Sequence, residues 1–162
     1  MILIILIGPN LPEILGCGNV LVDDLLNENF TLGLLLILFF AKFLFTMICF
    51  GTGTPGGIFL PLLVVGALVG GIFAKVGIMA GIFSAEWTTL FIIFGMAANF
   101  AAVVKAPVTG SILILELTGN FSYLLGLLVV SGVAFLISDL CGGEPAYSKL
   151  LQRSLSKSGI RK

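Results

Sequence analysis

The sequence predicts an all-α integral membrane protein whose helices are unequal in length and repeatedly broken. Of its 162 residues, 59% are hydrophobic and only 10% are charged, and its mean hydropathy is +1.22. A soluble domain has about a quarter of its residues charged, so this composition indicates a membrane protein. Crossing a hydrocarbon core takes roughly 20 apolar residues. Four apolar stretches approach or exceed that length: Leu32 to Phe50, Ile58 to Phe83, Thr88 to Val104 and Phe121 to Ser138.

The first two predicted elements are a partial helix and a full-length one. Pro9 and Pro12 interrupt the apolar opening of the chain, which runs into the acidic stretch Val22 to Phe30. Leu32 to Phe50 contains no proline and is rich in leucine and phenylalanine, so we expect a continuous membrane helix there. We expect it to stop at the glycines that begin with Gly51.

The long helix expected from Ile58 onward carries glycines in two pairs, each with a spacing of four residues: Gly66 with Gly70, and Gly77 with Gly81. All four would lie near one face of the helix. Small residues at this spacing let helices approach closely in a bilayer, where packing replaces the hydrophobic driving force. The alternative is that these glycines are merely scattered through a glycine-rich chain.

Two shorter apolar pieces follow. Thr88 to Val104 is barely long enough to span, and Lys105 and Pro107 are expected to end it. The next helix, which carries Glu116, has about thirteen residues, too few to span the roughly 30 Å hydrocarbon core unaided. We expect this helix to tilt, to pair with its neighbours or to stop partway across.

The positive charges of the chain gather at its C-terminus. Five of the eight basic residues occupy the last fourteen positions, so we expect residues 146–162 to form a terminal amphipathic helix and tail on the cytoplasmic side. A merely solubilising tail fits the same residues. The whole chain, 1–162, is expected to be a single multi-pass transmembrane unit in a lipid bilayer.

The sequence contains no residue pattern typical of a metal site or a redox site. Histidine is absent, and the three cysteines, Cys17, Cys49 and Cys141, are widely spaced with no metal-ligand or redox pattern. This argues against a zinc or haem enzyme. We therefore expect a protein that is not an enzyme, that has no cofactor or metal site and that binds no nucleic acid.

The stretch CFGTGTPGGIFLP, Cys49 to Pro61, breaks an otherwise almost continuous apolar run. A helix beginning near Ile58 leaves the amides of residues 57–60 without intrahelical acceptors, and Pro61 would lie in its first turn, where a missing N–H costs little. Free amides and the positive end of the helix dipole make an anion site. Without lysine or arginine nearby, such a site suits a weakly held anion such as chloride. A tight loop packed against neighbouring helices is the alternative, and composition leaves both open.

A second break, DLCGGEP from Asp139 to Pro145, ends the last long helix. Tyr147 follows just inside a new helix, where its hydroxyl could donate a hydrogen bond to an anion. A tyrosine near a helix end is also typical of an interfacial anchor. Glu116 is flanked by apolar residues, and intramembrane carboxylates are candidates for function; a neutral, hydrogen-bonded structural role is the alternative.

Three blocks of the sequence carry a resemblance to a known family. They are GTPGGIFLP (53–61), NFAAVVKAPVTGSILILELTGN (Asn99 to Asn120) and GGEPAYSKLLQRSL (Gly142 to Leu155). Their order and spacing resemble the C-terminal half of the CLC family of voltage-gated chloride channels and chloride/proton antiporters. The resemblance covers most of Phe30 to Leu155, and the pairing of the first block with the later tyrosine is its most specific part.

The resemblance implies a fold of tilted, uneven helices, one half of an inverted repeat, assembled as a homodimer with one pore per subunit. It implies chloride or a similar small anion as the substrate. In the block beginning at Gly57, the amides of Ile58 and Phe59 would face the anion, and the hydroxyl of Tyr147 would donate to it. Helices within 106–139 would contribute to the dimer contact, which makes Glu116 structural.

The chain also departs from the family pattern. It contains no GSGIP motif and no GREGP or GKEGP motif, which in the family belong to the N-terminal half and carry a serine anion loop and the gating glutamate. We therefore expect about half an anion pathway, with an N-terminal half as partner, in a truncated protein, a split-gene product or a remnant. Channel and antiporter both remain open, as do a non-transporting membrane subunit and a transporter of another small anion.

Overall fold

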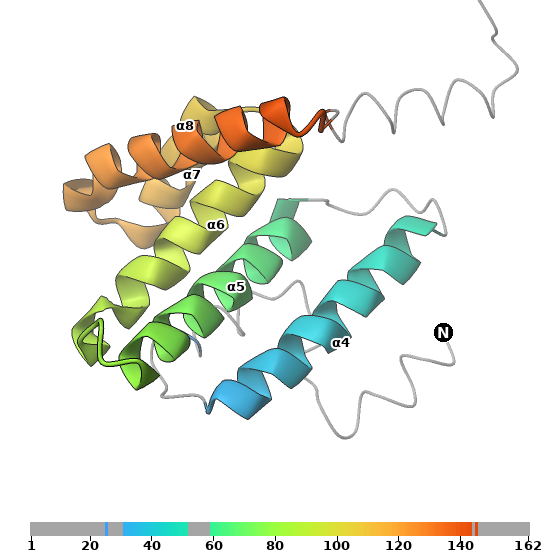
Figure 1. Cartoon of the computed structure of the whole chain (residues 1–162). Coiled ribbons are helices and arrows are strands. Elements are labelled where there is room, and N and C mark those ends of the chain that lie inside the picture. Colours follow the sequence, from blue (N-terminus) through green and yellow to red (C-terminus); the bar gives the residue numbers. More distant parts are fainter. Residues whose placement is uncertain (1–24, 26–30, 52–58, 144, 146–162) are drawn as a thin grey trace, which may run out of the picture. The chain divides into compact units, whose positions relative to one another are not determined.

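The computed structural model describes residues 25, 31–51, 59–143 and 145, and over these residues the secondary structure is entirely helical (Figure 1). Two 3₁₀ turns, η1 (Ala85–Trp87) and η2 (Phe121–Tyr123), precede α6 and α8. The all-α class predicted from the sequence is therefore confirmed. The α-helices of this part are α4 (Leu32–Gly51), α5 (Phe59–Met79), α6 (Thr88–Val104), α7 (Pro107–Thr118) and α8 (Leu124–Leu140).

The helices are uneven in length, as predicted. Two segments of the described chain are long and apolar enough to cross a membrane, Phe59–Met79 with 21 residues and Phe121–Leu140 with 20, each with a mean hydropathy of 2.2. By contrast, α6 has 17 residues and α7 has 12. The bounds of α6 agree with the prediction, and α7 is too short to span a membrane of ordinary thickness.

The chain divides into two compact units, Met1–Met96 and Ala97–Lys162, and the boundary between them falls inside α6. Each unit has its own packing, described separately below. The single transmembrane unit expected for residues 1–162 stays a prediction. The terminal helix and tail expected at 146–162 lie outside the described residues.

In the first unit, α4 packs along α5 (Figure 1). Leu35 and Leu38 of α4 are buried, as are Leu63 and Leu68 of α5. The opposite face of α4 carries large apolar side chains that remain exposed, as expected for a helix that contacts lipid rather than water. These side chains are Ile37, Phe40, Leu44, Met47 and Ile48.

The helix α5 and the first part of α6 approach each other at glycines. A methyl group on Gly70 would collide with the carbonyl oxygen of Phe91 and would lie 3.0 Å from the Cα atom of Ile92. A methyl group on Gly95 would collide with the carbonyl oxygen of Gly66 and would lie 2.9 Å from the Cα atom of Gly70. The predicted close approach is therefore confirmed for the pair Gly66 and Gly70.

The end of α5 differs from the prediction. The helix stops at Met79, and Gly81, which was expected on the helix face, lies in the following turn with a φ of +71°. The N–H of Gly81 donates to the carbonyl oxygen of Ile78 at 3.0 Å, and the N–H of Ile82 donates to that of Gly77 at 2.9 Å. This is a Schellman motif, which needs a left-handed residue and so favours glycine. The prediction was wrong because the apolar run continues past the residue that closes the helix.

In the second unit, α7 and α8 form a helical hairpin held by two buried serines. The hydroxyl oxygens of Ser111 and Ser131 are 2.6 Å apart. The Ser111 hydroxyl also lies 2.8 Å from the carbonyl oxygen of Pro107 and 3.2 Å from that of Leu127. Hydroxyl hydrogen bonds of this kind join helices where lipid supplies no hydrophobic driving force.

We expect the substitution Gly70→Ala to destabilise the first unit. The added methyl group would meet backbone atoms of Phe91 and Ile92, which can move aside only if the helices separate, a change that costs on the order of 1–3 kcal/mol. The measurement is the melting temperature of the purified chain in detergent. The control is Gly132→Ala on α8, where an added methyl group has no neighbour within 4 Å and alanine favours the helix. Equal melting temperatures for the two variants would contradict the close approach.

Candidate functional site

The sequence assigns four residues to an anion site: Gly57, Ile58, Phe59 and Tyr147. The structure places Phe59 as the first residue of α5, where it is half-buried. Gly57, Ile58 and Tyr147 lie outside the described residues, so the convergence of the four stays a prediction. The structure does describe the helix that begins at Phe59 and the end of the helix that precedes Tyr147 in the sequence.

The start of α5 has the features that an anion site at a helix end needs. The peptide dipoles of an α-helix add up to about half a positive charge at its N-terminal end. The helix runs uninterrupted for 21 residues, and its first turn contains no acidic side chain that would neutralise this partial charge. Pro61, its third residue, has no N–H to leave unsatisfied. The structure describes α5 from Phe59 onward, and the start near Ile58 predicted from the sequence stays a prediction, because residues 52–58 lie outside the described part of the chain.

The end of α8 is closed by a pair of glycines. Gly142 has a φ of +72°, and its N–H donates to the carbonyl oxygen of Asp139 at 2.9 Å. The N–H of Gly143 donates to the carbonyl oxygen of Ser138 at 2.9 Å. These two bonds form a Schellman motif directly after Leu140, the last residue of α8. The second break predicted from the sequence is therefore confirmed.

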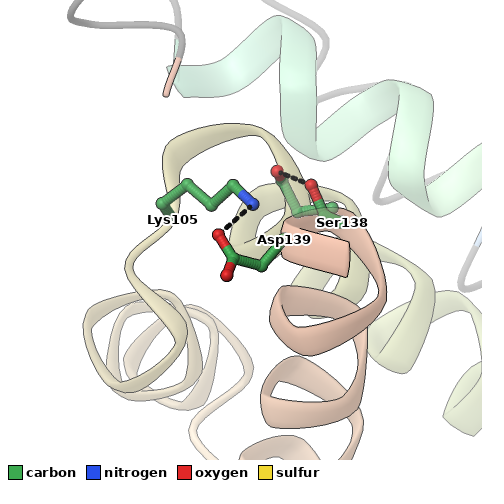
Figure 2. A network of polar contacts seen from close by, with 4 residues as sticks. Lys105, Ser138 and Asp139 are labelled. Carbon is green, nitrogen blue, oxygen red and sulfur yellow. Dashed lines mark hydrogen bonds and ion pairs between the residues drawn. The ribbon is translucent and has the colours of Figure 1, made fainter. Parts of the chain in front are cut away.

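The ends of α6 and α8 meet in a polar cluster that sequence analysis missed (Figure 2). The ammonium nitrogen of Lys105 lies 3.3 Å from a carboxylate oxygen of Asp139, and the Ser138 hydroxyl donates to the carbonyl oxygen of Ala102 at 2.8 Å. The same ammonium lies 5.3 Å from the centre of the Phe135 ring, within cation–π range. We call these five residues the α6–α8 junction.

The two charges of the junction differ in their exposure to solvent. The side chain of Lys105 is 8% exposed, whereas that of Asp139 is 68% exposed. Lys105 also has a φ of +64° and is the one non-glycine residue of the described ranges with a positive φ. For an ordinary residue this conformation costs roughly 1 kcal/mol. This conformation closes α6, because the N–H of Lys105 donates to the carbonyl oxygen of Ala101 at 3.0 Å in a left-handed helix cap, a position that usually carries glycine.

The sequence offers one sign of this ion pair: a lysine at one predicted helix break and an aspartate at another. Lys105 was interpreted only as the end of one helix and Asp139 only as the start of a break. The two residues are 34 positions apart, and nothing in the sequence between them indicates that their side chains meet.

Glu116 does not behave as the buried carboxylate that its apolar neighbours suggested. The structure exposes it on α7. Its sequence neighbours Leu115 and Leu117 differ in burial: Leu115 is in the core and Leu117 is exposed. Glu116 therefore lies on the outer side of the short helix, and its structural role, implied by the resemblance, stays a prediction.

The fold and these helix ends define a class of protein. Apolar helices of uneven length, with a glycine-rich segment immediately before a helix start, are typical of membrane transport proteins with broken helices. The family model for the voltage gated chloride channel matches residues 1–139. The chain belongs to this family, which confirms the resemblance found in the sequence.

Characterised relatives and one solved structure agree with the family. The H(+)/Cl(−) exchange transporter ClcA of Vibrio vulnificus (strain YJ016) is 42% identical over 153 residues, which cover 93% of this chain and 32% of that protein. The ClcA of Yersinia pestis bv. Antiqua (strain Angola) is 41% identical, with 88% of this chain and 30% of that protein covered. A slow cyanobacterial Cl−/H+ antiporter matches with a TM-score of 0.78 and 35% identity, covering 85% of this chain and 32% of the antiporter chain. The chain thus spans about a third of the length of these proteins.

We expect the substitution Gly143→Ala to loosen the end of α8. A methyl group there would lie 2.8 Å from both the carbonyl and the hydroxyl oxygen of Ser138, so the hydrogen bond from the Gly143 N–H would break. Losing one such bond costs about 1 kcal/mol, which corresponds to roughly fivefold faster amide exchange at residues 140–143. Hydrogen–deuterium exchange with mass spectrometry measures this rate. Gly132→Ala is the control, and unchanged exchange in the Gly143 variant would show that the cap does not hold the helix end.

Proposed function

We propose that this chain is the C-terminal part of a chloride channel or chloride/proton antiporter and that it binds the anion at the start of α5. The observation that carries the proposal is the position of that start, at Phe59 directly after the glycine-rich segment, in a member of the voltage gated chloride channel family. The relatives named as H(+)/Cl(−) exchange transporters favour proton-coupled exchange over a channel.

In this proposal the anion is held by partial charges alone. The amides of Ile58 and Phe59, in the block that begins at Gly57, donate to it, and the hydroxyl of Tyr147 donates from a second side. Residues 49–61 contain no lysine or arginine. A full positive charge would hold the anion too tightly for transport, whereas dipoles and hydroxyls bind it and release it.

The proposed setting is a multi-pass protein in a lipid bilayer, assembled as a homodimer, with its C-terminus in the cytoplasm. The clustered basic residues at 149–162 support this orientation. Chloride or a similar small anion is the substrate, and no cofactor is required because the protein is a transporter and not an enzyme. The pathway is completed by an N-terminal half that carries the motifs missing from this chain.

We expect Tyr147→Phe to weaken anion transport by removing one donor. A hydrogen bond to a charged group contributes about 1.5–3 kcal/mol, so the chloride concentration at half-maximal flux should rise about tenfold or more. The measurement is chloride flux into liposomes that contain this chain together with its N-terminal counterpart. Tyr123→Phe is a matched control, because Tyr123 is the other tyrosine of the chain and lies in η2, just before the N-terminal end of α8. Equal flux curves for the two variants would remove Tyr147 from the site.

A bulky residue at position 57 should block the proposed anion site next to the backbone amides. In Gly57→Leu, the side chain would occupy the space through which the anion approaches the amides, so maximal flux should fall at least about tenfold. The same liposome assay measures this loss. Gly33→Leu is the control, because nothing lies within 4 Å of an added methyl group at Gly33. Undiminished flux in the Gly57 variant would indicate that the glycines form a packed loop and not an anion site.

The main alternative is a non-transporting membrane subunit that keeps the packing of the family. It predicts stable dimers or hetero-oligomers in crosslinking experiments and no anion flux under any pairing with an N-terminal half. Competition among chloride, nitrate and fluoride in the flux assay separates a chloride transporter from a transporter of another small anion.

A further inference from the structure

The α6–α8 junction holds the last turn of α8 at two adjacent residues. The Ser138 hydroxyl donates to the carbonyl oxygen of Ala102, and the Asp139 carboxylate pairs with Lys105 (Figure 2). Ala102 and Lys105 are three residues apart, so the two contacts lie about one helical turn apart on the α6 side. Two contacts at this separation restrict both the position and the rotation of the α8 end.

The same two residues of α8 also determine where the chain goes next. The carbonyl oxygens of Ser138 and Asp139 accept the N–H groups of Gly143 and Gly142, both at 2.9 Å. The direction in which the backbone leaves α8 therefore follows from the residues that the junction holds. Tyr147 is only four residues beyond Gly143 in the sequence.

Lys105 is the residue that closes α6, and its N–H donates to the carbonyl oxygen of Ala101 at 3.0 Å. Its φ of +64° would suit glycine or asparagine better than lysine. Its ammonium group is mostly withdrawn from solvent, between the Asp139 carboxylate and the Phe135 ring. A lysine at a cap position that favours glycine, with its ammonium contacted by a carboxylate and an aromatic ring, points to a role for the ammonium itself.

We propose that Lys105 is a positioning residue for the second anion donor: by pairing with Asp139 it fixes the end of α8 and thereby the start of the segment that carries Tyr147. The functional part of this inference rests on the proposed anion site. The mechanical part, that the ion pair fixes the end of α8, does not.

The first test measures how chloride flux depends on chloride concentration, in the liposome assay with the N-terminal counterpart. Lys105→Met keeps the apolar stem and removes the charge, and Asp139→Asn removes the other charge. Both should raise the chloride concentration at half-maximal flux about fivefold, with a smaller change in maximal flux. Lys105→Arg keeps the charge and should restore the original value to within about twofold.

Two comparisons in this test separate positioning from general damage. Lys75→Met removes a lysine from α5 for which the structure shows no ion pair among the described residues, and it should leave the flux curve unchanged. In a Tyr147→Phe background, Lys105→Met should add nothing, because it acts through the same hydroxyl. An equal effect with and without that hydroxyl would overturn the functional part of the proposal.

The second test does not depend on transport. Cys141 is exposed and lies between the end of α8 and its glycine cap, so a spin label there reports the motion of the helix end. In a full chain with Cys17→Ala and Cys49→Ala, Lys105→Met and Asp139→Asn should increase the mobile fraction of the label severalfold, whereas Lys105→Arg and Lys75→Met should not. Unchanged label mobility in Lys105→Met would overturn the proposal whatever the flux results. If Tyr147→Phe has no effect on flux while the mobility changes as expected, the anion site fails and the mechanical role of Lys105 stands.

Discussion

Peptide groups inside a membrane must find hydrogen-bond partners within the protein, and this constraint explains how the described helices begin and end. The end of α5 is closed by the turn at Gly81 and the end of α8 by the turn at Gly142, each through the same pair of backbone bonds. Pro107 begins α7 without an N–H group that would need an acceptor. Because each of these ends is satisfied locally, the fold tolerates helices that are uneven in length.

The lipid bilayer also determines which contacts hold the helices together. Lipid provides no hydrophobic driving force between apolar faces, so contacts between backbones and between hydroxyl groups take its place. Gly70 and Gly95 allow α5 to lie against α6, and Ser111 and Ser131 join α7 to α8.

The two kinds of positive charge in the structure serve different purposes. The ammonium group of Lys105 is compensated by Asp139 and by the Phe135 ring, which makes it a part of the scaffold. The start of α5 offers only the partial charges of peptide groups, with no acidic side chain in its first turn to cancel them. The anion site proposed above requires this separation, because partial charges hold an anion less tightly than a full positive charge does.

The amino-acid sequence by itself determined the all-α membrane class, the bounds of α6 and the break after α8, because hydropathy, length and local glycine and proline content decide these features. The sequence identified Gly66 and Gly70 as a contact surface but not their partner Gly95. It also placed Gly81 inside a helix, whereas the helix ends at Met79 and Gly81 lies in the following turn. Only the tertiary structure brought Lys105 to Asp139 and exposed Glu116. Contacts between residues far apart in the chain depend on how whole helices pack, and a local pattern carries no information about that packing.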